Sequence, residues 1–360
     1  MGESGFTSIK RPNQSDWKTL TVPDDGVYIV SLTADPCYGC RPTLHMPVTL
    51  RRPGWPVQVH FTTLAMDIVS HAEAAVALKQ NDTLTLYVHG WAQAATSFSV
   101  AYVSGLDGHY TTVVTTSASN SALLHFNMQM VDNSWSGLFG NQSSSFSVPT
   151  TGMYWVTARI VPVSIDVVIR ITTENSTSTR ILFNVYGEKY RAVSCSGAFR
   201  LSSGSVVKAE NPSTAMYATE TTLSFVYLEG NGKPHTDPDE HIAFTGSLTS
   251  KLQRGHHQVV PFPDHLTNYG RLYTNNGRIT IHRSGSYMIS LRPNPPADVS
   301  AEFLLVVNHK IRWGSHSEEG VPSGQTVPMV LEANDTVVVI THNTPVVETG
   351  SLFSIAFLRS

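Results

Sequence analysis

The residues with the clearest chemical potential are three carboxylates in a short polar segment, HTDPDEH. Asp237, Asp239 and Glu240 offer the oxygen ligands that a hard cation such as calcium prefers. Acidic segments of this kind are also typical of solvated linkers, so both interpretations stay open. Calcium is the one cofactor that the sequence suggests. A histidine pair in GHH, from Gly255, is interpreted as surface polar residues rather than as a metal site.

The three cysteines form an odd set, so at least one thiol lies outside any disulfide. Cys37 and Cys40 form a Cys-x-x-Cys in DPCYGC, whose Asp, Pro and Gly neighbours indicate a loop rather than the helix start of a thioredoxin-type pair. We expect a small loop disulfide. The alternative, a zinc site, needs two more ligands, and His45 supplies only one. Cys195 is expected to be a small buried hydrophobe.

No residue spacing in the sequence is typical of catalysis. The sequence contains no nucleophile elbow, no HExxH pair, no phosphate-binding glycine loop and no recurring carboxylate pair, so we expect no enzyme. A net charge of -3 without a run of like charges gives no electrostatic footprint for nucleic acid or an anionic membrane. No apolar stretch approaches the roughly 18 residues of a membrane span.

The elements that must position these residues are short β-strands. Hydrophobic residues make up 41% of the 360 and charged residues only 14%, whereas an average domain has roughly 25% charged residues. Strand-forming alternation appears in SFSVAYV from Ser97, RITIHRS from Arg278 and VVVITH from Val337, between Gly, Asn, Pro and Asp clusters. Helical composition appears only around residues 72–78, which can also be read as a strand. Length and strand spacing predict two or three all-β sandwiches or barrels.

Three landmarks recur in the same order with a period of about 130 residues. The first is Gly-x-Tyr, in GVYIVS from Gly26, GMYWVT from Gly152 and GSYMIS from Gly285. The second is a leucine before a tight turn and a β run, in LKQNDTLTL, LSSGSVVKA and LEANDTVVV. The third is a closing apolar strand, in TSFSVAYVSG, TTLSFVYLEG and SLFSIAFLRS. Glycine permits the positive φ of a tight turn before the strand. The repeat predicts three domains, at residues 1–105, 106–231 and 232–360.

The third unit resembles the globular head of complement C1q and its relatives in the C1q and tumour necrosis factor superfamily. The resemblance is carried by AFTGSL from Ala243, VPFPDHLTNYGRLYTNNGRITIHRSGSYMISL from Val260, FLLVVNHK from Phe303 and the last two landmarks. It covers essentially the whole unit. The second unit keeps this order less closely. The first unit departs at its front, because too few residues precede Gly26 for the family's first strand and its partner.

The resemblance implies three tandem, ten-stranded antiparallel jelly-roll sandwiches. Heads of this family form tight trimers through aromatic residues near a threefold axis, so we expect this polypeptide to build an intramolecular pseudo-trimer. The residues that match axis positions are the motif tyrosines and the closing-strand aromatics: Tyr28, Tyr154, Tyr287, Phe98, Tyr102, Phe225, Tyr227, Phe353 and Phe357.

The family's heads are extracellular recognition modules, so the resemblance implies a secreted binding protein, lectin-like or innate-immune, with glycans or proteins as partners. Trp91, in HGWAQAA, is a candidate for stacking on a sugar, or else a rim residue that covers a neighbouring head. A structural or adhesive matrix module with higher-order self-assembly is the main alternative, and a cytokine-like receptor ligand is the third. Five Asn-x-Ser/Thr triplets fit an extracellular glycoprotein: Asn13, Asn81, Asn141, Asn175 and Asn334.

Overall fold

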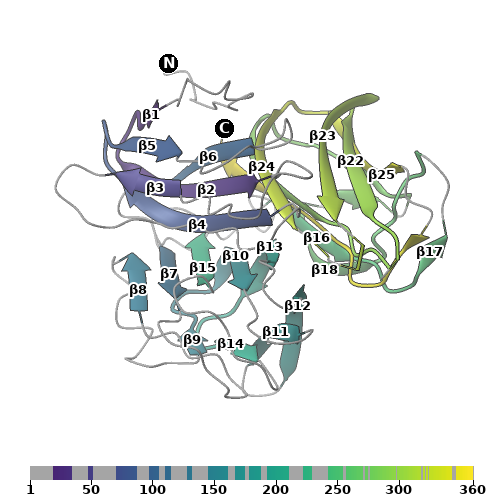
Figure 1. Ribbon diagram of the computed structural model, residues 1–360, viewed down its shortest axis with the longest axis horizontal. Coiled ribbons are helices and arrows are strands. Elements are labelled where there is room, and N and C mark those ends of the chain that lie inside the picture. The colour runs from purple at the N-terminus through teal and green to yellow at the C-terminus, as the bar shows by residue number, and fades with distance from the viewer. Residues whose placement is uncertain are drawn as a thin grey trace, which may run out of the picture.

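The structure is a computed structural model, and within the residues it describes every regular element is a β-strand and every strand pair is antiparallel (Figure 1). It describes residues 19–34, 48–51, 70–86, 97–104, 110–114, 128–131, 145–160, 167–174, 178–187, 193–210, 222–228, 242–253, 257–270, 272–274, 276–296, 298–317, 319–320, 322, 324–342 and 346–359. The prediction of an all-β fold is confirmed.

The strands from the middle of the chain form two facing sheets. The inner sheet has the order β13-β10-β15-β7-β8 and the outer sheet the order β12-β11-β14-β9. Apart from the neighbours β7–β8 and β11–β12, which share a sheet, successive strands lie in opposite sheets, as in a jelly roll. The bounds of this second strand group are β7 Tyr110–Val114, β8 Met128–Val131, β9 Ser145–Ser147, β10 Gly152–Ile160, β11 Val167–Glu174, β12 Thr179–Gly187, β13 Val193–Leu201, β14 Val206–Glu210 and β15 Thr222–Tyr227.

A third strand group repeats this plan. Its inner sheet has the order β18-β16-β27-β21-β24, its outer sheet the order β19-β20-β25-β22-β23, and β17 pairs with β26. The bounds are β16 Ala243–Ser247, β17 Leu252–Gln253, β18 Asp264–Tyr269, β19 Tyr273–Thr274, β20 Arg278–Thr280, β21 Gly285–Arg292, β22 Ala301–Val307, β23 Lys310–Ser317, β24 Gln325–Leu331, β25 Thr336–His342, β26 Val346–Val347 and β27 Leu352–Arg359.

The first strand group has two three-stranded sheets, β4-β2-β6 and β1-β5-β3. Among the residues that the structure describes it has no counterpart of β7 or β16, the first strands of the other two groups. Residues 72–78 lie in a strand, so the helical reading of that stretch is wrong. The bounds are β1 Thr19–Thr21, β2 Gly26–Ala34, β3 Val48–Arg51, β4 Ser70–Leu78, β5 Thr83–Leu86 and β6 Ser97–Ser104.

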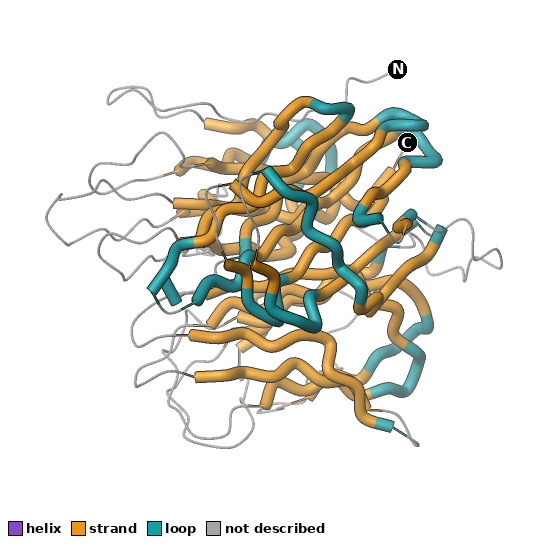
Figure 2. The backbone as a smooth tube through the Cα atoms, turned by 90° about the vertical axis from the view of Figure 1, so that its right-hand side faces the viewer, coloured by secondary structure: helices purple, strands orange, loops and turns teal. Residues whose placement is uncertain are grey.

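The three groups lie next to one another, with the first at the upper left of Figure 1, the second below it and the third at the right. A view turned by 90° shows that most strands of the molecule run in broadly similar directions (Figure 2). Each described strand pair stays within one group. The groups therefore contact one another through sheet faces and side chains rather than through continuous sheets.

The turn at the second landmark is the same in all three groups. Asn81, Gly204 and Asn334 have positive φ values of 69°, 79° and 73°, which is the left-handed conformation that Asn and Gly tolerate best. In two of the turns an aspartate accepts a backbone hydrogen bond, from Lys79 N to Asp82 Oδ2 at 2.7 Å and from Glu332 N to Asp335 Oδ2 at 2.8 Å. The predicted tight turn is confirmed at each position.

The glycine of the first landmark is explained only in part. Gly285 has a positive φ of 153°, but neither Gly26 nor Gly152 has one. The expectation of a positive-φ turn is therefore wrong for two of the three copies. The register itself does repeat, because these glycines pair with Leu78, Leu201 and Leu331.

Candidate assembly interface

The central strand of each inner sheet buries side chains on both faces. Every residue of β10 is buried, although successive side chains of a strand point to opposite sides. Tyr154 and Val156 lie in the core between the two sheets of the second group. Met153 and Trp155, which point the other way, lie in a cluster that draws residues from all three groups. This second face is the candidate assembly interface.

The three motif tyrosines have equivalent surroundings. Tyr28, Tyr154 and Tyr287 each donate a hydrogen bond to a backbone oxygen four residues upstream, at 2.7, 2.6 and 2.6 Å. Each ring also contacts an aromatic ring of the closing strand, with centroids 5.3 Å apart for Tyr28 and Tyr102, 5.1 Å for Tyr154 and Tyr227, and 5.3 Å for Tyr287 and Phe357. The tyrosine therefore fastens the start of its strand to the closing strand of the same group.

These aromatics do not form the contact between groups that the sequence predicts. The second core holds Tyr154, Phe225 and Tyr227, and the third core holds Tyr287 and Phe353 with Phe357 packed against it. Tyr28 and Tyr102 contact each other, and neither belongs to the cluster shared by the groups. The backbone of Phe98 pairs with Leu32, and its side chain lies outside the description. Apart from Phe98, which stays a prediction, the axis assignment of these residues is wrong because the other strand face meets the neighbouring groups.

The shared cluster consists of the side chains that alternate with the tyrosines, together with alanines and larger apolar residues of the flanking strands. Its alanines let neighbouring sheets approach closely while the larger side chains fill the space between them. Its members are Val27, Ile29, Ala75, Ala101, Val103, Met153, Trp155, Ala198, Val226, Ala243, Met288, Ala356 and Leu358.

One step further along the strands, the same face becomes polar. The strand register places polar residues opposite one another: Ser31 pairs with Glu73, Thr157 with Ser196, and Ser290 with Thr326. Eight buried polar residues make up this part of the face, and we call them the central polar layer: Ser31, Glu73, Thr157, Ser196, Ser224, Ser290, Thr326 and Ser354.

Glu73 connects the first group to the second. Its Oε1 accepts hydrogen bonds from Trp155 Nε1 at 2.6 Å and from Thr157 Oγ1 at 2.5 Å. The Glu73 residue is only 1% exposed, so donors from the neighbouring group replace water at this carboxylate oxygen. Accordingly, β4 lies against β7, β10 and β15.

Thr245 connects the second group to the third. Its Oγ1 donates to Ala198 O at 2.8 Å and lies 3.1 Å from Ala198 N and 3.0 Å from Ser354 Oγ. At the edge of the contact, Arg200 Nη1 donates to Tyr269 Oη at 2.9 Å and its guanidinium lies 5.2 Å from that ring centroid. Here β13 lies against β16, β18, β21 and β27.

A third contact connects the third group back to the first. Ser31 Oγ donates to Thr326 O at 3.0 Å, and β24 lies against β2 and β6. In the three contacts, the equivalent strands β4, β13 and β24 each lie against the inner sheet of another group. The contacts therefore close into a ring.

Arg292, at the end of β21, extends from the third group into the second. Its Nη1 donates to Asn184 O at 2.6 Å and lies 3.9 Å from Cys195 Sγ. Burial raises the pKa of the Cys195 thiol, and the nearby Arg292 guanidinium partly opposes that rise. Cys195 is buried and unbonded to another cysteine in the described part of the chain, as the sequence predicts.

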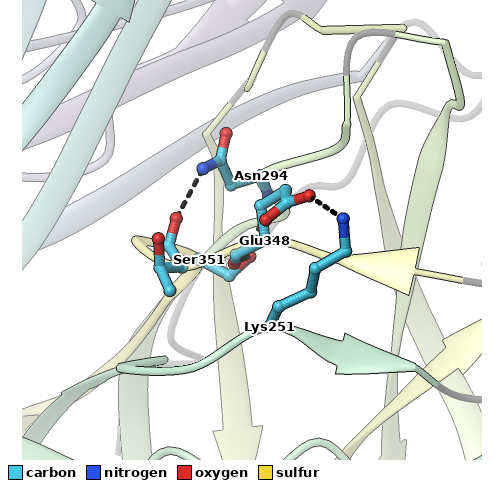
Figure 3. Close-up of polar contacts among 5 residues, drawn as sticks. Lys251, Asn294, Glu348 and Ser351 are labelled. Carbon is cyan, nitrogen blue, oxygen red and sulfur yellow. Dashed lines mark hydrogen bonds and ion pairs between the residues drawn. The ribbon is translucent and has the colours of Figure 1, made fainter.

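Polar contacts hold the backbone that carries Arg292. Asn294 N donates to Ser351 Oγ at 2.8 Å, and Asn294 Nδ2 donates to Thr349 O at 2.5 Å. Beside them, Lys251 Nζ lies 2.6 Å from Glu348 Oε1, so one small cluster fastens the β21 end to the β26–β27 turn (Figure 3). The position of Arg292 in the second group is therefore supported from within the third.

Gly324 permits a close backbone approach between two groups. Its N–H donates to Ser194 O at 3.1 Å, and Ser194 Oγ lies 3.3 Å from Gly324 O. A Cβ at Gly324 would lie 2.5 Å from Ser194 O, a distance that real side chains do not tolerate. Only glycine fits this position without a shift of one backbone.

The surface of the third group carries a histidine pair. His257 Nε2 lies 3.0 Å from His342 Nδ1, and His342 Nε2 lies 3.9 Å from Glu302 Oε2. Over the described ranges no group of three or more His, Cys, Asp or Glu is arranged to hold a metal ion. Two histidines offer only two nitrogen ligands, so we keep the interpretation of GHH as surface polar residues.

Several predicted site residues lie outside the described residues: Trp91, Asp237, Asp239, Glu240, Cys37, Cys40, Asn13, Asn141 and Asn175. Their roles in ligand binding, calcium binding, a disulfide and glycosylation stay predictions. Asn81 and Asn334 lie at exposed turns. The described part of the chain contains no helix that could cross a membrane.

Sequence reasoning missed the residues that carry most of the polar contact between groups, namely Glu73, Thr245 and Arg292. For Glu73 a signal was present, because an acid within HAEAAVAL interrupts an otherwise small and apolar run. For the other two the sequence carries no comparable signal.

Comparison with known proteins gives distant matches. No protein-family model and no curated protein matches the sequence. Among solved structures, murine APRIL matches with 15% identity and a TM-score of 0.28 over 33% of this chain and 100% of that chain. The globular domain of zebrafish complement 1qA matches with 15% identity and a TM-score of 0.27, over 33% and 96%. A structure of PNGF-II matches with 7% identity and a TM-score of 0.27, over 88% and 84%. TM-scores this low are insufficient to establish a shared fold, so the architecture rests on the strand orders and registers given above.

Proposed function

We propose that the chain is a non-enzymatic extracellular recognition protein in which three tandem C1q-like heads, residues 1–105, 106–231 and 232–360, close on one another as a pseudo-trimer. The observation that carries this proposal is the shared cluster. It takes residues from all three strand groups and covers the outer face of each inner sheet. A head with that face uncovered would expose a continuous apolar surface to water.

The directions of the contacts support a closed arrangement. Each of β4, β13 and β24 lies against the inner sheet of a different group. Contacts between unlike surfaces either close into a ring or propagate into a filament. Here the contacts run from the first group to the second, from the second to the third and from the third back to the first, so one chain supplies both surfaces of every contact.

Sedimentation across a wide range of protein concentrations tests the closed form. We expect a compact particle with the mass of one chain at every concentration. An extended particle, or an obligate assembly of several chains, would contradict the pseudo-trimer.

Recognition by loops is the function that best fits such an object. The interface residues are committed to contacts between heads, and the sequence has no spacing typical of catalysis. The three heads are not identical, so one chain presents three different sets of loops. Trp91 is proposed as a ligand-stacking residue, and Asp237, Asp239 and Glu240 as calcium ligands.

A glycan and lipid-surface array, probed with and without calcium, tests recognition. We expect specific binding that Trp91→Ala reduces, and a calcium effect that Asp237→Asn and Asp239→Asn remove. Asp298→Asn is the matched control, because it removes an exposed carboxylate elsewhere. Binding that is absent under both conditions would contradict recognition of these ligand classes.

Exposed apolar residues on edge strands support the alternative, a self-assembling structural module. Ile181 on β12, Ile311 on β23 and Val330 on β24 are 43%, 58% and 52% exposed, and each strand lies at the end of its sheet. Edge strands offer unpaired backbone groups to other chains. If the protein self-associates at high concentration, Ile311→Lys should reduce that association; an unchanged association would contradict a role for this edge.

A further inference from the structure

The central polar layer contains one acid at a position that occurs three times. Glu73, Ser196 and Thr326 each lie five residues before the leucine that pairs with the motif glycine. Ser196 and Thr326 side chains are buried, and their hydroxyls have no hydrogen-bond partner among the described residues. Glu73, by contrast, accepts two hydrogen bonds across the contact between groups. The acid therefore distinguishes the first group's surface from the two equivalent surfaces.

One of the two donors to Glu73, the Trp155 indole, is also found in one group only. Trp155 lies three residues after Gly152, and the residues three after Gly26 and Gly285 are Ile29 and Met288. Neither of those side chains can donate a hydrogen bond. Thr157 corresponds to Ser31 and Ser290, which keep a hydroxyl. Only the second group thus offers both an indole N–H and a hydroxyl to the carboxylate.

We propose, on the basis of the pseudo-trimer proposed above, that the β4 face is a selective surface whose partner is the β10 face of the second group. Glu73 is compatible with that partner, because Trp155 and Thr157 both donate to its Oε1. Packing against the third group would place Met288 where the indole should be. Since a buried carboxylate is costly without strong donors, the wrong order of heads is disfavoured.

The same residue disfavours assembly of like heads from different chains. Three first groups around one axis would bring three copies of Glu73 into one buried layer, each facing Ile29 instead of Trp155. Like charges in one desolvated layer repel each other strongly. A single buried polar residue that selects its partner at some cost in stability is well known from coiled coils. Here it would direct three similar heads into one order within one chain.

A double-mutant cycle on the full chain tests this pairing. Glu73→Ser introduces the residue found at the equivalent position of the second group, and Trp155→Met introduces the residue of the third. Both single variants should lower the denaturation midpoint, and the double variant should lower it by less than the two separate shifts combined. Ser196→Ala is the matched control and should shift the midpoint least, because the Ser196 hydroxyl has no hydrogen-bond partner among the described residues. Purely additive shifts, or a Glu73→Ser shift no larger than the control's, would overturn the proposal.

Exclusion of wrong partners has its own measurement. Native mass spectrometry of mixed light and heavy chains reports association between chains directly. We expect Glu73→Ser to increase the amount of mixed-chain species. Glu73→Gln keeps the acceptor oxygen and the shape but removes the charge, so its denaturation midpoint should stay close to that of wild type. If Glu73→Ser forms no more mixed species than wild type, the exclusion role is wrong. Wild-type chains that are already oligomeric would instead contradict the pseudo-trimer, while the mutant cycle would still report whether Glu73 and Trp155 are coupled.

Discussion

At the scale of single residues, the motif tyrosine is a fastener inside one sandwich. In all three groups its hydroxyl reaches back to a carbonyl and its ring meets the closing strand. A hydrogen bond of this kind contributes about 1 kcal/mol to the free energy of unfolding. The residue is therefore repeated because each sandwich needs it, not because the groups meet there.

Tyr287→Phe tests this role and its pH dependence. Burial raises the pKa of Tyr287 above its usual range, and the charge of Arg283 partly opposes the rise. The neutral phenol therefore stabilises the fold below the ordinary tyrosine pKa of about 10, and this contribution is lost as the pH rises beyond it. We expect wild type to exceed Tyr287→Phe in unfolding free energy by about 1 kcal/mol near neutrality. Denaturant titrations at increasing pH should show the difference shrinking in alkali; a constant difference would contradict the titration.

The Cys195 thiol should be inert in the folded protein. Because burial raises its pKa, the reactive thiolate is scarce at neutral pH, and the closed interior excludes reagents. Iodoacetamide should label Cys195 only after denaturation. Peptide mass spectrometry separates it from Cys37 and Cys40. Rapid native labelling at Cys195 would show that the contact between the second and third groups opens readily.

At the scale of strands, the sequence predicted which strands exist and in what order better than it predicted which face of each strand meets another group. The landmarks correctly located the Gly-x-Tyr strands, the tight turns of the second landmark and the closing strands. They could not decide which face meets another group, because Tyr154 and Val156 on one side and Met153 and Trp155 on the other are all apolar and all buried. A period of two identifies a buried face only when the opposite face is polar.

The strand β4 shows a second limit of sequence reasoning. Its alanines have high helix propensity, which favours a helical reading in isolation. In the fold these small side chains lie between two sheets, where Ala75 belongs to the shared cluster. Tertiary packing thus overrides the local preference, and no local pattern shows that a neighbouring sheet will be present.

Gly324→Ala should damage the contact between the second and third groups. The added Cβ would lie 2.5 Å from Ser194 O, and forced overpacking of a tight contact costs about 1–3 kcal/mol. Gly204→Ala is an instructive control, because nothing lies within 4 Å of its Cβ and its cost is confined to the φ of 79°. Hydrogen exchange should increase along β13 in the Gly324 variant and remain local to the turn in the control. Equal exchange patterns would contradict a tight approach at Gly324.

At the scale of the whole molecule, the groups share parts of their interiors. Leu352 lies on β27 of the third group, yet it belongs to the core of the second. Arg292 crosses the same contact. The second sandwich is therefore completed by side chains from the third.

Leu352→Ala should weaken the second group although the substitution lies in the third. Removing a buried leucine costs about 2–5 kcal/mol, and here part of that cavity opens toward the second core. Hydrogen exchange should rise in β10 and β13 as well as in β27. Leu305→Ala, which lies in the third core, is the control and should spare β10. An effect confined to the third group in both variants would contradict the shared interior.

The position of Leu352 also has a consequence for protein synthesis. A ribosome delivers β10 and β13 well before β27, so the second sandwich leaves the exit tunnel with one part of its core still missing. Domains in tandem usually fold one after another as they emerge. In this chain we expect the middle unit to complete its core only after β27 has emerged. A release of the chain before β27 would leave two incomplete cores rather than one.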